Sequence, residues 1–497
     1  MITDSGGEWL REFTEKVLQK ARDLGASYAD VRIVSEVEEQ VRVKNGRVDS
    51  LRSSTDRGFG VRVIADGAWG FASSSVLTDD EAERVASDAV RIARASARLK
   101  KEDVKLAPVE PAEGHFESEW KIDPFEVPLE EKIGLLLDAD RVMRQQPEVK
   151  IAGGHTHFWR TEKTFASTEG SYIEQVRTEG GGGIDATAIG EGDMQRRRSQ
   201  PYGDAGYAAK GYEFVESWDA VGHAEQTARE AADLLKAPQC PSDVRDVILA
   251  GDILMLQMHE SCGHPIELDR VFGTEASYAG TSFLTTDKLG KFRYGSDKVN
   301  IVADATVPGA LGTFPYDDEG VPGQCVDIVK EGIFSGYLSS RETAAKMGWS
   351  RSGGAMRAES WNRIPLIRMT NVNLLPGDWT LDEIIKDTKK GIFASAVKSF
   401  SIDDKRLNFL FATEIAWEVE NGSLGRMLKN PTYTGITYEF WGSCDAVSGR
   451  GGEWNMYGIP GCGKGEPPQA GRVGHGVAPS RFKNVQIGVM EPPTEPS

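Results

Sequence analysis

Two histidines flank a glutamate near the middle of this chain, in the segment Met258-His259-Glu260-Ser261-Cys262-Gly263-His264-Pro265. Neutral imidazole is a good zinc ligand, since its ordinary pKa is about 6.5. A carboxylate beside two such ligands can take a proton from water, as in the zinc enzymes that hydrolyse peptide bonds. The chain has only seven histidines in 497 residues, so two of them within six positions argue against coincidence. The segment predicts that His259 and His264 hold a metal ion and that Glu260 is a general base.

The spacing H-E-x-x-x-H is one residue longer than the usual motif on a zinc-protease helix, and this has a structural consequence. Positions i and i+5 of an ideal helix lie about 140° apart, so the two imidazoles could not face one ion. Either the helix widens there into a π-type turn, or it unwinds at Gly263. We expect unwinding, because Gly263 frees the backbone and Pro265 disfavours helix at the residue before it. The alternative without metal is a buried histidine pair at the end of a core helix.

A catalytic zinc site usually has three protein ligands, and the residues alone leave the third one open. The candidates are Cys462, Cys444, His475, Glu267 and Asp269. Cys462 lies between glycines in an expected loop near the C-terminus, where the backbone could approach a metal closely. Cys262 lies inside the motif, but its position there is crowded by both imidazoles. We expect Cys262 to pack as a small buried hydrophobic residue.

Composition limits the class of protein. The net charge of −18 argues against a nucleic-acid partner and against an anionic membrane surface. There is no apolar run of about 18 residues, so no transmembrane helix is expected. The polar N-terminal residues contain no signal-peptide core, and the five cysteines are few, odd in number and scattered. These features predict a reduced, cytoplasmic protein.

The elements that must position the site divide into two groups. In the first half, helices are expected at residues 8–24, 79–99, 129–144 and 220–236. Strands are expected between them, with hairpin turns at Asn45-Gly46 and Asp66-Gly67 and further antiparallel strands between 149 and 214.

Pro238 and Pro241 mark the boundary to the second half. A buried strand at 244–249 then leads into the helix of the motif. Thr380 and Glu383 have capping-box spacing for a later helix, and a long strand is expected at 409–419. The fold class is therefore α+β. An N-terminal antiparallel sheet with flanking helices occupies residues 1–237, a mainly antiparallel β domain with the metal-site helix occupies 242–490, and a disordered tail occupies 491–497.

Three other patterns suggest sites that we do not expect to form. Gly458–Lys464 fits the first seven positions of a phosphate-binding loop, but Gly465 replaces the required Ser or Thr. The glycine run 180–183 is expected to be a flexible turn. His155 and His157 would share one face of a strand, and a structural or surface role is favoured for them.

Four segments, taken together and in order, resemble the TldD/PmbA peptidases. The resemblance covers essentially the whole chain, because the matching segments lie far apart: His259-Glu260-Ser261-Cys262-Gly263-His264, Asp317-Asp318-Glu319-Gly320-Val321-Pro322-Gly323-Gln324, Arg368-Met369-Thr370-Asn371 and Gly461-Cys462-Gly463-Lys464. It implies that zinc is held by His259, His264 and Cys462 and that Glu260 is the general base. Since all the motif residues are present, the chain resembles the active, TldD-type members.

The resemblance also implies a substrate and a partner. Members of the family cleave unfolded peptides or small proteins in the cytoplasm, and they form homodimers or heterodimers with a PmbA/TldE-type partner. Two other functions remain open from the residues. A fourth protein ligand such as Cys444 would close the zinc site and make the chain a non-catalytic, zinc-stabilised partner protein. The same site could also hydrolyse small-molecule amides.

Overall fold

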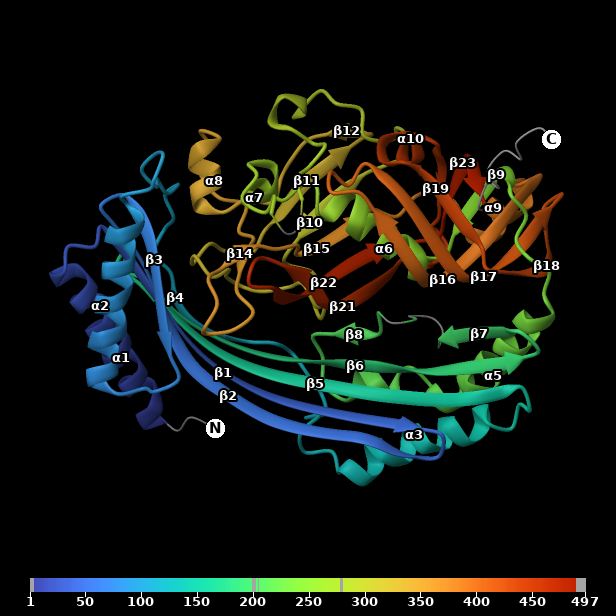
Figure 1. Ribbon diagram of the computed structural model, residues 1–497, viewed down its shortest axis with the longest axis horizontal. Coiled ribbons are helices and arrows are strands. Elements are labelled where there is room, and N and C mark those ends of the chain that lie inside the picture. Colours follow the sequence, from blue (N-terminus) through green and yellow to red (C-terminus); the bar gives the residue numbers. More distant parts are fainter. Residues whose placement is uncertain (1–3, 199–202, 204, 278–279, 489–497) are drawn as a thin grey trace.

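The computed structural model describes residues 4–198, 203, 205–277 and 280–488. The chain is a mixed α+β protein, as the sequence predicts, and strands dominate both halves (Figure 1). The tail expected at 491–497 lies outside the described residues. No described helix combines the length and the apolar character needed to span a membrane.

A long, curved sheet is built by the first half of the chain. Its strand order is β3-β2-β1-β5-β6-β4, and β7 and β8 also pair with β6. Neighbours are antiparallel except β4, which lies parallel to β6. The strands are β1 (Tyr28–Lys44), β2 (Arg47–Ala65), β3 (Ala68–Ser74), β4 (Glu113–Glu117), β5 (Val149–Ser167), β6 (Tyr172–Gly190), β7 (Asp193–Arg198) and β8 (Tyr207–Ala208).

Both expected hairpin turns are confirmed. Asn45 and Gly46 have φ values of 50° and 77°, and Asp66 and Gly67 have φ values of 51° and 73°. Two successive residues with positive φ form the type of turn whose twist matches that of the flanking strands, which explains the preference for Asn-Gly and Asp-Gly. The two turns set the register of β1, β2 and β3.

Helices cover the sheet on the side away from the C-terminal half. Helices α1 (Asp4–Asp23) and α2 (Asp79–Ser96) share one apolar core with β1 and β2. Helices α3 (Leu129–Met143) and α5 (Ala220–Lys236) share another with β5 and β6, and a short α4 (Glu213–Glu216) precedes α5. The concave face of the sheet remains turned toward the C-terminal half (Figure 1).

The expected flexible turn at Gly180–Gly183 is wrong, because these residues lie buried within strand β6. A Cβ atom at Gly180 would lie 2.1 Å from the ring of Phe158, and one at Gly181 would lie 2.0 Å from the carbonyl oxygen of Gly206. The glycines are therefore required by close packing against the strand and not by chain flexibility.

The second half of the chain forms two larger sheets and a small one. The first larger sheet has the order β12-β11-β10-β15-β22-β21. The second has the order β16-β9-β23-β19-β17-β18, and β20 also pairs with β23. The second sheet closes on itself, because β16 pairs with β17 as well. The strands of the first are β10 (Ile301–Asp304), β11 (Cys325–Lys330), β12 (Ile333–Phe334), β15 (Asn371–Leu374), β21 (Asn455–Lys464) and β22 (Gln469–Val477). Those of the second are β9 (Asp243–Leu249), β16 (Lys390–Ile402), β17 (Asn408–Glu420), β18 (Ser423–Lys429), β19 (Thr432–Ile436), β20 (Cys444–Val447) and β23 (Ser480–Ile487).

Short elements complete this half. They are the two-stranded pair β13 (Met356–Arg357) and β14 (Leu366–Ile367), and the helices α6 (Gly251–Met258), α7 (Leu268–Val271), α8 (Arg341–Lys346), α9 (Leu381–Asp387) and α10 (Thr437–Gly442), with a 3₁₀ turn at Thr286–Lys288. The capping box expected at Thr380 and Glu383 is present at the start of α9. Helix α6 belongs to the main apolar core, which also takes residues from both larger sheets.

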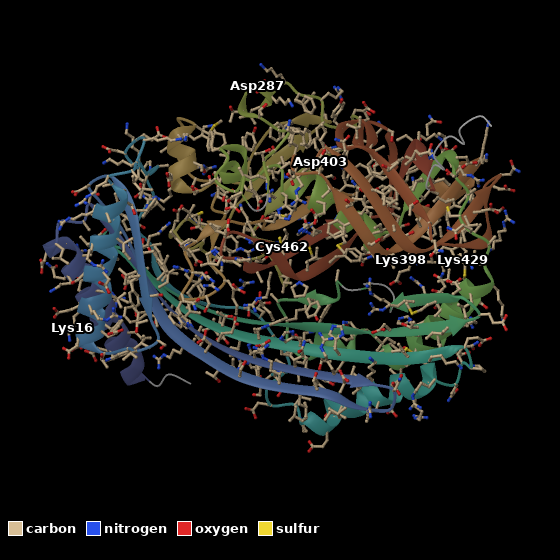
Figure 2. All side chains as sticks on the ribbon, viewed as in Figure 1. Lys16, Asp287, Lys398, Asp403, Lys429 and Cys462 are labelled. Carbon is tan, nitrogen blue, oxygen red and sulfur yellow. The ribbon has the colours of Figure 1, made fainter. Side chains whose placement is uncertain are left out.

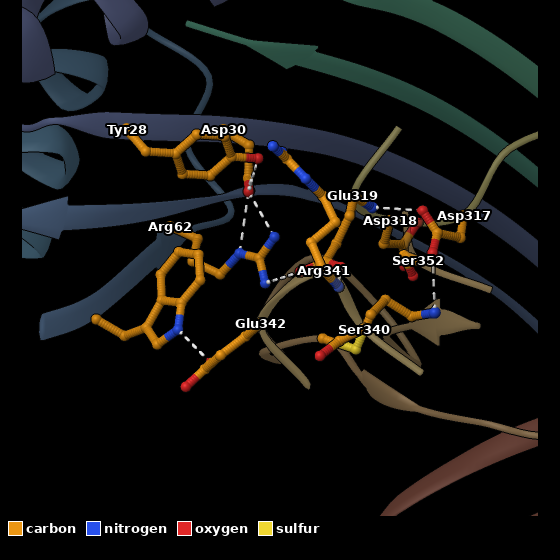
Figure 3. Close-up of polar contacts among 12 residues, drawn as sticks. Tyr28, Asp30, Arg62, Asp317, Asp318, Glu319, Ser340, Arg341, Glu342 and Ser352 are labelled. Carbon is orange, nitrogen blue, oxygen red and sulfur yellow. Dashed lines mark hydrogen bonds and ion pairs between the residues drawn. The ribbon is translucent and has the colours of Figure 1, made fainter. Parts of the chain in front are cut away.

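A buried polar network ties the two halves together (Figure 3). Arg62 of β2 donates to Asp30 of β1 at 2.7 and 2.9 Å, and it also donates to Glu319 of the second half at 3.2 Å. The backbone N–H of Arg341 donates to the same glutamate at 2.7 Å. Buried ion pairs are stable only when their remaining polar atoms form hydrogen bonds. Here both carboxylate oxygens of Glu319 accept one. We call Asp30, Arg62 and Glu319 the interdomain clamp.

Asp317 and Asp318, which precede Glu319, have separate roles. The Asp317 carboxylate accepts from the backbone N–H groups of Glu319, Val321 and Met356 at 2.9 to 3.0 Å, and this fixes the loop. Asp318 lies between Lys163 and Arg32 of the N-terminal sheet. The acidic segment 317–319 therefore joins the halves.

Candidate metal centre

Helix α6 is a buried platform. Its residues Ile253, Leu254, Met255 and Met258 are all buried in the main core. The helix follows strand β9 after Ala250, so its start is fixed by the closed sheet. A site at the C-terminal end of such a helix is held rigidly, which metal coordination requires.

The helix does not unwind at Gly263 as expected. Instead, residues His259–Gly263 form a π-turn, and the N–H of His264 donates to the carbonyl oxygen of His259 at 3.1 Å. A hydrogen bond from i+5 to i widens the turn and brings residues five apart onto the same face. Gly263 has another purpose, because a Cβ atom there would lie 2.3 Å from the sulfur of Met369. The alternative of a π-type widening is therefore the correct one.

Cys462 comes from a distant part of the chain, and the expected loop around it is wrong. It lies on β21, the edge strand of its sheet, next to an irregularity in the pairing with β22 between Ile459 and Cys462. Its Sγ atom is 3.8 Å from Nε2 of His264. Figure 2 shows Cys462 at the centre of the molecule, where the C-terminal half faces the curved sheet.

The structure brings His259, His264 and Cys462 into one cluster. One ligand atom from each residue lies within 4.8 Å of the others. The three residues are between 3% and 4% exposed. Within the described part of the chain, no further His, Cys, Asp or Glu belongs to this group. The set of two imidazoles and one thiol could hold a metal ion and leave a coordination position open.

Both imidazoles are oriented by a partner on the Nδ1 side. His259 Nδ1 lies 2.8 Å from Nε2 of His475, and His264 Nδ1 lies 3.1 Å from a carboxylate oxygen of Glu267. Metal-binding histidines typically have such a partner, which fixes the ring and leaves the other nitrogen for the ion. His475 and Glu267 are two of the candidates for the third ligand. They contact the Nδ1 atoms of the imidazoles instead.

The remaining candidates lie elsewhere. Asp269 accepts from the Lys464 ammonium at 2.7 Å, and Cys444 lies on β20, outside the cluster. His155 and His157 hold other partners, since His155 bonds Tyr207 at 3.0 Å and His157 bonds Glu38 at 2.6 Å.

The protonation of the cluster suits metal binding. Burial lowers the pKa of His259 and of His264, so both imidazoles stay neutral. Burial alone would raise the pKa of Cys462, but nearby groups, above all the positive charge of Arg368, outweigh it and hold that pKa below its ordinary value. Burial raises the pKa of Cys262 to about 12 and also raises that of Cys444. Because the thiolate is the metal ligand, Cys462 is the best suited of these cysteines.

Glu260 has a partner from a distant part of the sequence, Arg406. The guanidinium of Arg406 donates to the Glu260 carboxylate, and both side chains are mostly buried. Arg406 lies between β16 and β17 with a φ of 62°, an uncommon value for a residue with a side chain. Its backbone is held there by Asp403, whose carbonyl oxygen it contacts at 2.9 Å, and by the Thr437 hydroxyl at 2.8 Å. No motif in the sequence marks this arginine.

Sequence models of the PmbA/TldA metallopeptidases match nearly the whole chain: domain 1 matches residues 29–93, the central domain matches 122–237 and the C-terminal domain matches 242–488. The chain belongs to the PmbA/TldD family of metallopeptidases. The resemblance inferred from the four sequence segments is therefore confirmed.

Curated relatives agree. A metalloprotease of Methanocaldococcus jannaschii is 31% identical over 87% of this chain and 91% of its own length. A metalloprotease TldD homolog of Haemophilus influenzae is 27% identical over 93% and 92%. A zinc metalloprotease TldD homolog of Saccharolobus solfataricus is 26% identical over 87% and 91%. The chain is thus a metallopeptidase and a metal-dependent enzyme.

Solved structures share the fold. A protein described as a putative modulator of a DNA gyrase from Thermotoga maritima superposes with a TM-score of 0.76 at 18% identity, covering 96% of this chain and all of that one. TldE from Thermococcus kodakarensis superposes with a TM-score of 0.72 at 15% identity, with the same coverage. At this identity the likeness establishes the fold alone.

Proposed function

We propose that the chain is a zinc-dependent peptidase in which His259, His264 and Cys462 hold the ion and Glu260 is the general base. The convergence of three buried donors from two distant segments supports this most directly. The positions of His475 and Glu267 support it further, because each contacts Nδ1 of one imidazole and so leaves Nε2 as the nitrogen that could bind the ion. The name of the Saccharolobus solfataricus relative includes zinc.

The donor set fits zinc. Zinc combines well with thiolate and imidazole, and bond lengths of about 2.3 Å to sulfur and 2.1 Å to nitrogen place the two donors about 3.6 Å apart at a tetrahedral angle. The observed separation between Cys462 Sγ and His264 Nε2 is 3.8 Å. A hard ion such as Mg²⁺ prefers oxygen ligands, which this set does not supply.

The chain's own residues then account for the proton transfers. Zinc, when bound, supplies Lewis acidity that makes water a nucleophile near neutral pH. Glu260 accepts the proton of the attacking water and delivers it to the amine that leaves when the peptide bond breaks. Arg406 holds one oxygen of that carboxylate and thereby fixes its direction. The buried surroundings of the cluster exclude bulk water from the donors.

The proposal extends to substrate, partner and location. We infer that the substrates are unfolded peptides or small proteins and that the working unit is a homodimer or a heterodimer with a PmbA/TldE-type partner. The structural likeness to a TldE protein supports such a pairing. We place the enzyme in the cytoplasm, in line with five cysteines that are all free.

The variant Glu260→Gln tests the mechanism. The amide keeps the shape but accepts no proton, so peptide turnover should fall by about 10² to 10⁴-fold. Zinc content, measured by elemental analysis, should stay near one ion per chain. Loss of zinc together with activity would make Glu260 a ligand and overturn its role. Zinc without hydrolysis of any peptide by the unmodified protein would favour the zinc-stabilised partner, and hydrolysis confined to small amides would favour the amide hydrolase.

A further inference from the structure

A cleft of about 530 Å³ lies between the N-terminal sheet and the C-terminal half. Strands β1, β2, β5 and β6 form one wall, and residues 357–363 together with the hairpin of β21 and β22 form the other. This hairpin also carries Cys462. The cleft therefore shares a structural element with the proposed zinc site, and this makes it a candidate for holding part of the substrate.

The cleft is cationic although the protein is strongly acidic. Eight arginine and lysine side chains line it against five aspartates and glutamates, whereas the chain as a whole carries a net charge of −18. Several of the cations are paired within the wall. Arg472, for example, contacts Glu36 at 2.7 Å and Glu179 at 2.8 Å.

Two of the arginines have no acidic partner among the residues that the structure describes. Arg357 donates to the backbone carbonyl oxygens of Arg472 at 2.8 Å and Met369 at 2.6 Å. Arg368 donates to the carbonyl oxygens of Gln469 and Cys462. Neither forms an ion pair within the described residues, and the Nε atom of each is buried with no acceptor. They are only 9% and 2% exposed.

An uncompensated buried cation is unfavourable, because burial removes water without supplying a counter-charge. Burial lowers the pKa of Arg357 to about 9, and repulsion by the positive charges of Arg177 and Arg368 contributes to this shift. An anion that enters the cleft would offset this. The planar guanidinium is well suited to a carboxylate, with which it can form two parallel hydrogen bonds.

The acidic groups in the cleft limit what can bind. Glu36, Glu38 and Asp56 line the same space, so a chain with many negative charges would be repelled. The excess of positive charge is small and suits one or a few carboxylates. A peptide carries such a group either on an Asp or Glu side chain or at its C-terminus.

We propose that this cleft binds a carboxylate of the peptide substrate through Arg357 and Arg368, and that the enzyme consequently prefers peptides with an acidic residue or a free C-terminus. This inference rests on the proposed peptidase function. Arg368 joins the two sites, since its guanidinium bonds both strands of the hairpin that holds Cys462.

The test uses three matched fluorescent peptides. The first has an internal Asp and an amidated C-terminus, the second has Asn and a free C-terminus, and the third has Asn and an amidated C-terminus. Their affinities are measured by fluorescence anisotropy with the zinc-loaded Glu260→Gln variant, so that binding is observed without turnover. The values of kcat/KM are measured with the unmodified enzyme.

We expect the first or the second peptide to bind about 10- to 100-fold more tightly than the third, as hydrogen bonds to a charged group do. Added salt should reduce this ratio. Arg357→Gln should reduce it as well, whereas the exposed control Arg426→Gln on β18 should leave it unchanged. Arg368→Gln is a second variant, should the Arg357 variant fail to fold.

Equal affinity for all three peptides would overturn the cleft proposal while leaving the peptidase intact. A preference that survives in both Arg357→Gln and Arg368→Gln, with zinc and melting temperature retained, would also overturn it. Failure of the proposed function is distinguishable, because it would appear as zinc-loaded enzyme that cleaves no peptide at all. In that case too, the ratio of peptide affinities measured with Glu260→Gln shows whether the cleft binds a carboxylate.

Discussion

The Nε2 atom of His475 lies 2.8 Å from Nδ1 of His259, while its own Nδ1 lies 3.0 Å from the carbonyl oxygen of Val372. A carbonyl oxygen can only accept, so Nδ1 of His475 carries a hydrogen. The neutral ring then accepts at Nε2, and His259 must donate from Nδ1. The lone pair of His259 is thereby placed on Nε2. The carbonyl oxygen of Val372 on strand β15 thus sets, through His475, the tautomer of the proposed zinc ligand His259.

Replacing His475 should therefore weaken zinc binding without removing a ligand. His475→Ala is expected to lower zinc affinity by about 10- to 100-fold, measured by competition with a chelator. His475→Gln should recover part of the loss, because its amide oxygen can accept from His259. His115 lies on β4 with an exposed side chain, so His115→Gln is a matched control. Unchanged affinity in His475→Ala would show that His259 needs no orienting partner.

Much of the fold follows from local patterns. The hairpins at Asn45 and Asp66 and the capping box at Thr380 depend on residues adjacent in sequence, and all three are present. The long helices are predictable because each buries one face of a regular repeat. Such features need no knowledge of the tertiary structure.

Other features depend on tertiary contacts, which local sequence patterns do not show. The π-turn at His259 depends on packing around Gly263, where Met369 excludes a side chain. On the strand that carries Cys462, a tertiary contact requires glycine only at Gly458, where a Cβ atom would lie 2.0 Å from the carbonyl oxygen of Tyr207; Gly461 and Gly463, which flank Cys462, have no neighbour within 4 Å of such an atom. Glycine in a local pattern indicates a break or a turn, so the sequence predicts unwinding at Gly263 and a loop around Cys462, where the structure has a π-turn and strand β21. Arg406 could not be found, because only the folded chain brings it to Glu260.

The cysteines give a second prediction. Cys462→Ala should leave the purified protein without bound zinc and without activity, since the loss of one of three ligands usually empties a catalytic site. Cys262→Ala and Cys444→Ala should both retain about one zinc per chain, because burial keeps those two thiols protonated. Elemental analysis of the three variants provides the comparison. Retention of zinc by Cys462→Ala, with loss in Cys444→Ala, would move the third ligand to Cys444.

Arg406 gives a third prediction, which concerns rate and not metal. Without its contact the Glu260 carboxylate loses its fixed direction, and a misplacement of about 1 Å can reduce turnover by about 10²-fold. Arg406→Ala should therefore lower kcat to that extent while zinc content stays unchanged. Arg406→Lys should recover only part of the loss, because an ammonium lacks the planar fork.

Lys405 is the matched control for this variant, since it precedes Arg406 and its side chain is exposed. Lys405→Ala removes the same charge and should retain full activity. An Arg406→Ala enzyme with normal kcat would show that Glu260 is positioned without the arginine.

The last prediction concerns the interdomain clamp. Arg62 is 3% exposed at its side chain and pairs with Asp30 and Glu319, so its removal deprives two buried carboxylates of their ion-pair partner. Breaking a buried ion pair in this way typically lowers the free energy of unfolding by about 3–5 kcal/mol. Arg62→Met should show a loss of this size in urea denaturation of the zinc-loaded protein. Arg84→Met, which removes an exposed arginine of α2, should leave the unfolding midpoint unchanged.

A double variant separates the two possible causes of that loss. If uncompensated charge is responsible, adding Glu319→Gln to Arg62→Met should restore part of the stability, because one buried charge is then removed. If the loss came only from the missing hydrogen bonds and the contact between the Arg62 guanidinium and the Trp69 ring, at 4.4 Å, the second substitution would lower stability further. Restoration would establish the clamp as an electrostatic link between the sheet and the half of the chain that carries the metal centre, and a further loss would refute it.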